Sequence, residues 1–197
     1  MKTNSIASLR REQVRNSVET IEFKNKVNEF LKSATPELQY AIKRDLSIMT
    51  SMPFYKDRPK VVKFKKDPID LICGYATLFA TCPDKEFIIK LIRKLSINQG
   101  QTLRKAAPRI GKKKEIWEHV IPAKVITEEL IKMVLNNDLT DLRKMLQIYR
   151  LAGQRGLTKE ENRLLDKYRC SMPLGWDWRH EDVDPLARHT EVGIIYI

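Results

Sequence analysis

With 197 residues, the chain is long enough for one domain, or for one domain with a small helical extension. Hydrophobic residues make up 42% of it, so a sizeable core can form, but no apolar run is long enough to span a bilayer. The formal net charge of +12 attracts polyanions, which makes nucleic acid the first candidate partner and a membrane surface the second.

The cysteines and the N-terminus indicate a compartment. Cys73, Cys82 and Cys170 are odd in number and form no CxxC pair, which argues against a disulfide framework and against a cysteine-rich zinc site. The first eleven residues carry charges with no apolar run behind them, so they do not resemble a secretion signal. The sequence therefore predicts a protein of the reducing cytoplasm that binds nucleic acid and no membrane.

The first part of the chain carries the patterns of four helices. Apolar side chains recur at helical spacing from Val14 to Leu31. Thr35-Pro36-Glu37 combines a capping residue, a proline for the first helical position and an acidic first turn. Asp67-Pro68 and Pro83-Asp84 open two further apolar stretches in the same manner. The helices are therefore expected at residues 14–32, 36–48, 68–80 and 84–95.

Two basic segments interrupt this helical part. Residues 51–66 contain two prolines and are predicted to form a loop, with a short strand at residues 61–64 as an alternative. Residues 99–114 form the second segment. Clustered positive charge of this kind suits the phosphate backbone of nucleic acid. The candidate contacts are Lys60, Lys63, Lys65, Lys66, Arg104, Lys105, Arg109, Lys112, Lys113 and Lys114.

The boundary between two regions is expected near Lys114. Residues 1–114 would form a basic helical region that binds DNA, and residues 115–197 would carry the chemical site, with one continuous domain as the alternative. After the boundary, residues 116–122 predict a short strand that runs into a loop.

The next elements along the chain are less regular. Thr127 is a candidate N-cap for a helix from about residue 128 to 135, and residues 141–151 fit either a helix or a strand. Thr158-Lys159-Glu160-Glu161 fits a capping box, which predicts a helix to about residue 168. The tail after residue 171 is expected to be irregular and to pack on the core through Trp176 and Trp178.

The sharpest signal for chemistry is Glu118-His119, at the end of the predicted strand. A carboxylate can hold a divalent cation, and an imidazole, whose pKa is ordinarily near neutrality, can take the proton of an attacking water. Adjacent strand residues point to opposite faces, so both side chains reach one site only where the strand bends. Pro122 would supply such a bend.

The stretch Glu118-His119-Val120-Ile121-Pro122-Ala123-Lys124 resembles the first motif of the HNH, or ββα-metal, nucleases. The later stretch Leu157-Thr158-Lys159-Glu160-Glu161-Asn162 is similar to their second element, where a short strand ends and a helix begins that presents a metal ligand. The tail stretches Ser171-Met172-Pro173-x-Gly175-Trp176 and Asp184-Pro185-x-Ala187-Arg188 are similar to the segment after that helix in some restriction-type members. Residues 127–151 would then be a helical insertion between two strands.

The resemblance implies a role for each of these residues. His119 would be the general base and Glu118 a metal ligand. Asn162 would be a second ligand or would fix the motif loop, and Glu161 would replace it if the helix register differs by one. The implied cofactor is Mg²⁺ or another hard divalent cation, which clamps the scissile phosphate. The implied activity is that of an endonuclease, with double-stranded DNA preferred over RNA.

Each residue also has an ordinary structural explanation. A lone histidine on a strand is usually a half-buried structural residue, Glu161 is explained by the capping box, and Asn162 by a solvated helix face. A non-catalytic basic regulator that binds nucleic acid is the competing function, and a protein whose basic face docks an acidic partner is a third.

The predicted fold class is α+β and predominantly helical: an N-terminal helical part, then an elaborated ββα-metal motif. The oligomeric state is left open between a monomer and a homodimer.

Overall fold

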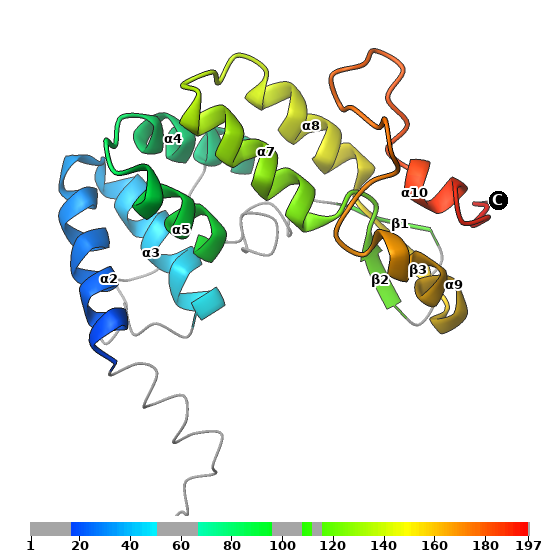
Figure 1. Cartoon of the computed structure of the whole chain (residues 1–197), viewed down its shortest axis with the longest axis horizontal. Coiled ribbons are helices and arrows are strands. Elements are labelled where there is room, and N and C mark those ends of the chain that lie inside the picture. The colour runs from blue at the N-terminus through cyan, green and yellow to red at the C-terminus, as the bar shows by residue number, and fades with distance from the viewer. Residues whose placement is uncertain (1–16, 51–66, 96–107, 112–115, 197) are drawn as a thin grey trace, which may run out of the picture.

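The structure, a computed structural model of the whole chain, describes residues 17–50, 67–95, 108–111 and 116–196, with the backbone alone at residues 47–50. Within these residues it is predominantly helical with one small sheet of three strands, so the predicted α+β class is confirmed. The N-terminal helices lie at one end of the molecule and the sheet at the other (Figure 1). Two long helices connect these ends.

Four α-helices and a short 3-10 turn precede the sheet in the described part of the chain. Three of them begin at or within one residue of the predicted positions, whereas the first begins at Val18, after the cap Ser17. The Asp67 side chain accepts a hydrogen bond from Ile69 N–H at 2.8 Å, and Asp84 accepts one from Phe87 N–H at 2.9 Å. The elements are α2 (Val18–Phe30), η1 (Leu31–Ser33), α3 (Pro36–Thr50), α4 (Pro68–Ala80) and α5 (Lys85–Leu95).

The sheet has the strand order β1-β3-β2, with β1 at Arg109–Ile110, β2 at Ile116–His119 and β3 at Gln154–Leu157. The central strand β3 runs antiparallel to β2 and parallel to β1. It leads through Thr158 into α9 (Lys159–Leu164), which η2 (Leu165–Tyr168) continues. Strands β2 and β3 with α9 therefore form the predicted ββα order. The edge strand β1 was not predicted, because two residues are too few to show an alternating pattern.

Two helices fill the chain between β2 and β3: α7 (Ala123–Leu135) and α8 (Leu142–Ala152). The predicted start of the first one was wrong. Thr127 is not its cap but lies inside it, where the hydroxyl donates to the carbonyl oxygen of Ala123 at 3.1 Å. The helix starts directly after Pro122, whose fixed φ of −59° leads into it, and Ala123 is a strong helix former.

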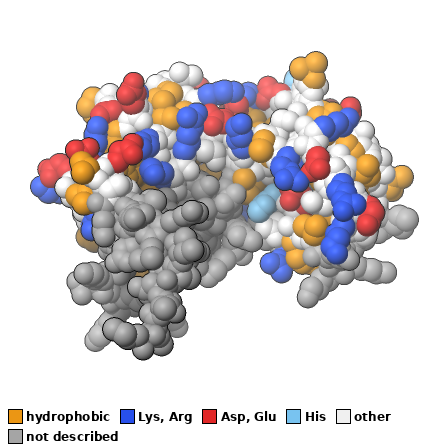
Figure 2. Space-filling view, turned by 60° about the horizontal axis from the view of Figure 1, so that its bottom comes forward, with side chains coloured by type: hydrophobic (Ala, Val, Ile, Leu, Met, Phe, Trp, Pro, Cys, Tyr) orange, Lys and Arg blue, Asp and Glu red, His pale blue; other side chains and the backbone are white. Residues whose placement is uncertain are grey.

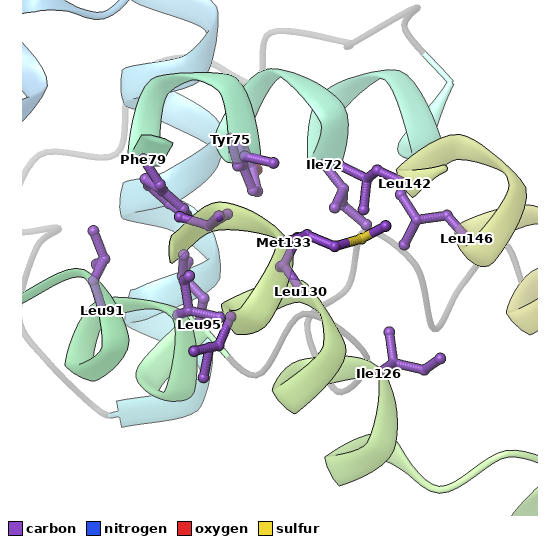
Figure 3. Packing of buried hydrophobic residues seen from close by; sticks show 14 of the residues in the cluster. Ile72, Tyr75, Phe79, Leu91, Leu95, Ile126, Leu130, Met133, Leu142 and Leu146 are labelled. Carbon is purple, nitrogen blue, oxygen red and sulfur yellow. The ribbon is translucent and has the colours of Figure 1, made fainter. Parts of the chain in front are cut away.

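One hydrophobic core joins the N-terminal helices to this insertion. Helices α4 and α5 pack on α7, and α4 also packs on α8. Two ion pairs join α8 to the start of α4, from Arg143 to Asp70 at 2.5 Å and from Arg150 to Asp67 at 2.7 Å. The buried cluster is therefore continuous across Lys114. Figure 3 shows its side chains meeting between the four helices: Ile72, Tyr75, Phe79, Leu91, Leu95, Ile126, Leu130, Met133, Leu142 and Leu146.

The C-terminal tail is largely irregular and folds back on the rest of the molecule, as predicted. Trp178 is 2% exposed within the core, and its indole N–H donates to the Glu129 carboxylate at 3.2 Å. Trp176 packs against the same cluster. The short helix α10 (Ala187–Thr190) then brings Arg188 and His189, both buried, to the ββα unit. None of the described helices is long and apolar enough to cross a membrane.

Candidate functional site

His119 is the last residue of β2 and lies opposite Gln154, the first residue of β3. The amide nitrogen of Gln154 is 3.0 Å from His119 Nε2, so one hydrogen bond joins the two side chains. On α8, the Tyr149 ring lies nearly parallel to the imidazole, with 6.0 Å between centroids and 15° between planes. His119 itself is half-buried. The two contacts therefore orient an imidazole that still reaches the surface.

Glu118 is bound to a buried arginine from the tail. The Arg188 guanidinium has no exposed surface, and its Nη2 donates to Glu118 Oε1 at 2.8 Å. It also donates to three backbone carbonyl oxygens, those of His119, Val120 at 2.8 Å and Tyr168 at 3.0 Å. Because Arg188 lies 70 residues after Glu118 in the sequence, this contact ties the end of β2 to a distant segment.

Glu118 and His119 point to opposite faces of the sheet. Strand β2 keeps its regular pairing to its last residue, with Glu118 opposite Arg155 and His119 opposite Gln154. The bend that would bring both side chains to one site is absent from β2, because Pro122 opens α7 instead. The structure therefore does not unite the two residues in one site through a bend of the strand.

The two helix candidates of the site have different surroundings. Glu161 closes the predicted capping box: its Oε2 accepts from Thr158 N–H at 2.8 Å, and its own N–H donates to Thr158 Oγ1 at 3.2 Å. Asn162 is half-buried, and its backbone N–H donates to the Thr158 carbonyl oxygen at 3.0 Å. The structural explanation of Glu161 is thus confirmed.

The Glu118 face of the sheet carries a cluster of ionisable groups from the tail. His189 Nδ1 is hydrogen-bonded to the Tyr196 hydroxyl. Burial, and then the guanidinium groups of Arg188 and Arg155, lower the pKa of His189 to about 4. Burial raises the pKa of Tyr196 to about 12, and the carboxylates of Glu161 and Glu118 act in the same direction.

The residues around this face fit the implied cation only in part. Among the described ranges, no three His, Cys, Asp or Glu side chains are grouped as metal ligands. Mg²⁺ is commonly held by only one or two carboxylates, with water and substrate phosphate as its other ligands. Glu118 and Glu161 are the carboxylates that the resemblance implies. Each carboxylate already accepts a hydrogen bond, from Arg188 and from Thr158 respectively. A cation at this face would share or displace those partners.

Of the predicted nucleic-acid contacts, only Arg109 lies within the described residues, where it is exposed on β1. Figure 2 shows that basic side chains of the described residues are interspersed with acidic ones on the face it draws, instead of forming one block. The other predicted contacts lie outside the described ranges: Lys60, Lys63, Lys65, Lys66, Arg104, Lys105, Lys112, Lys113 and Lys114.

Three residues around the Glu-His pair were not predicted to contact it. Tyr149 lay in a stretch that fitted helix or strand equally well, so its side of the sheet was not predictable. Gln154 carries no motif, and only the strand register brings it to His119. Arg188 stood in the Asp184-Pro185-x-Ala187-Arg188 stretch, whose residue types gave no sign that the arginine would be buried.

Comparison with protein-family models, with curated proteins and with solved structures finds no match to this chain.

Proposed function

We propose that the protein is a metal-dependent endonuclease of the HNH type that hydrolyses phosphodiester bonds in DNA, with His119 as the general base. The observation that carries the proposal is the order β2, insertion, β3, α9, with a Glu-His pair at the end of β2. The motifs implied this ββα order even though the helices α7 and α8 separate its two strands. The net charge of +12 supports a polyanionic substrate.

The contacts of His119 fix the orientation of its ring. A catalytic imidazole needs a partner that sets its ring orientation and an open side toward the reacting water. Gln154, 3% exposed, is such a partner for the orientation, but its amide N–H donates to Nε2, so the lone pair of Nε2 becomes available to a water molecule only when this hydrogen bond opens. Residue His119 is half-buried, and in the proposed reaction a water molecule that attacks phosphorus would lose its proton to the imidazole.

The divalent cation would supply charge neutralisation of the scissile phosphate. Glu118 is the ligand proposed for it on the strand, and Asn162 or Glu161 the ligand proposed on α9. Because Glu118 and His119 point to opposite faces of β2, the proposal requires the end of β2 to rearrange when the cation and the DNA bind. Arg188 holds Glu118 in a fixed position but also neutralises its charge, so the cation would have to share or displace this partner.

A specific observation favours the competing function, a non-catalytic regulator that binds nucleic acid. The carboxylate of Glu118 is already neutralised by a buried arginine, and Glu161 is used in a helix cap. Both carboxylates therefore have structural roles that need no metal. The regulator would bind DNA by the same basic segments and leave it intact.

The substitution His119→Ala separates the two functions. For the nuclease, cleavage of duplex DNA with Mg²⁺ should fall by about 10²- to 10⁴-fold, the usual contribution of a positioned base, while DNA binding is retained. His180→Ala is the matched control, because His180 is exposed in the tail and should cut at the parental rate. Glu118→Gln and Asn162→Ala should raise the Mg²⁺ concentration needed for half-maximal cleavage.

The proposal fails if the parent protein leaves DNA intact with Mg²⁺ and with Mn²⁺, or if His119→Ala still cuts at the parental rate. Thermal melting of the same samples distinguishes a structural role. A core histidine replaced by alanine leaves a cavity and an unpaired Gln154 amide, so an early melting transition together with lost cleavage would support a structural histidine.

A further inference from the structure

Arg109, Gln154 and His119 form one row across the sheet. In the register of the strands, Arg109 of β1 is paired with Gln154 of β3, and Gln154 is paired with His119 of β2. Paired residues of neighbouring strands point to the same face. The Arg109 guanidinium lies 5.2 Å from the centre of the Trp117 ring, and Trp117 is two residues before His119 on that face. The strand register and the ring contact therefore both place Arg109, Gln154, His119 and Trp117 on the same face of the sheet.

Arg109 is an exposed cation that pairs with no carboxylate of the described residues. Within the described part of the chain, no carboxylate lies within ion-pair distance of its guanidinium, although many other arginines of the structure pair with Asp or Glu. Its contact with the Trp117 ring restrains the side chain. A guanidinium stacked on a ring keeps its in-plane N–H donors available, and their fork geometry matches a phosphate group.

We propose that Arg109, held on Trp117, binds a backbone phosphate of the same DNA strand whose scissile phosphate lies at His119. Neighbouring strands are about 4.8 Å apart, so the backbones of Arg109 and His119 are separated by roughly 10 Å. Because the guanidinium lies against the Trp117 ring of β2, the phosphate that it binds would lie nearer to His119 than this backbone separation, at a neighbouring nucleotide of the same strand. The sheet face from β1 to β2 would thus follow one strand of the substrate.

This inference rests on the proposed function for the place of the scissile phosphate, but its binding part can be tested without cleavage. The probe is a short fluorescein-labelled DNA duplex, titrated with the full chain in the presence of EDTA at several salt concentrations. For Arg109→Ala, the slope of log K against log salt should become less steep by about 0.9, the value for one phosphate contact on B-DNA. Affinity at low salt should drop roughly tenfold.

Two further variants define what Arg109 contributes. Arg109→Lys keeps the charge but loses the planar fork, so it should retain the parental salt slope with weaker binding. Arg163→Ala is the control for loss of one arginine charge, because Arg163 is exposed on α9 and its side chain makes no ion pair or hydrogen bond with the other described residues. Its salt slope should equal that of the parent. Circular dichroism of all variants should match the parent, because both arginines are exposed.

The outcomes separate this inference from the proposed function. If the parent binds the duplex and Arg109→Ala binds with the parental slope and affinity, the phosphate site is overturned while the nuclease proposal stands. If Arg109→Ala and Arg163→Ala change the slope equally, the effect is general charge, and the site is again overturned. If the slope changes only for Arg109→Ala but no variant or parent cuts with Mg²⁺, the phosphate contact stands and the nuclease proposal fails.

Discussion

Replacing Arg188 by methionine tests whether the tail holds the end of β2. Methionine has a similar unbranched shape but donates no hydrogen bond. The guanidinium is fully buried and donates to the Glu118 carboxylate and to three carbonyl oxygens. Its loss leaves a carboxylate that is only 29% exposed without its counter-charge. Removing one partner of a buried ion pair typically costs about 3–5 kcal/mol, which is the loss of unfolding free energy expected for Arg188→Met.

The assay is urea unfolding followed by circular dichroism, with thermal melting in parallel. A loss of that size lowers the melting temperature by roughly 6–20 °C in a chain of this length. Arg143→Met is the matched control, because the Arg143–Asp70 pair is about half exposed and should contribute no more than about 1 kcal/mol. An Arg188→Met variant that loses no more stability than this control would show that the contacts of Arg188 with the end of β2, here called the clamp, do not stabilise the fold.

Three further outcomes are expected. The pKa of His189 is lowered to about 4 from an ordinary value of 6.5, so between these pH values the unfolded chain binds a proton that the folded chain rejects. The contribution of His189 to the unfolding free energy should therefore be fully present above about pH 6.5 and be lost as the pH drops toward 4. In urea melts at several pH values, His189→Gln should show a weaker dependence of the unfolding free energy on pH. Thr158→Ala should cost about 1 kcal/mol in unfolding free energy through loss of the capping box, whereas Thr158→Ser should keep most of it. Gly153→Ala should lower the unfolding free energy by about 2–3 kcal/mol or more, because φ is +64° and the new Cβ would lie 2.4 Å from the carbonyl oxygen of Pro108. Gly175→Ala is the control, because Gly175 is also at positive φ but has open space around it, and this variant should melt much closer to the parent.

The elements that could be predicted are those whose signals are local. The starts of α3, α4 and α9 follow from a capping side chain and its neighbours within four residues, so Thr35, Asp67 and Thr158 indicated them directly. The start of α7 was missed because Thr127, a good cap by residue type, was preferred over Pro122. A threonine inside a helix satisfies its hydroxyl on the preceding turn, and the sequence alone does not distinguish that role from a cap.

The candidate site was predictable only in part, because its contacts join distant segments. The Glu-His pair was placed correctly at the end of a strand. The partners of that pair, Gln154 and Arg188, lie about 35 and 70 residues farther along the chain, and no periodicity reaches over such distances. The same reason explains the separation of Glu118 and His119: the regular strand pairing that puts them on opposite faces depends on the register with β3.

The clamp by Arg188 also has a consequence for the timing of protein synthesis. A ribosome adds roughly 5–20 residues per second, so Arg188 is made about 4–14 s after Glu118. For about the first half of that interval, β3 has not been synthesised and β2 cannot pair with it. For the whole interval, the Arg188 guanidinium that binds Glu118 is missing, whereas α2 to α5 have already been synthesised. The end of β2, where His119 lies, therefore takes its final position only when nearly all of these residues have been made, and a chain interrupted before Arg188 would carry the Glu-His pair without its clamp.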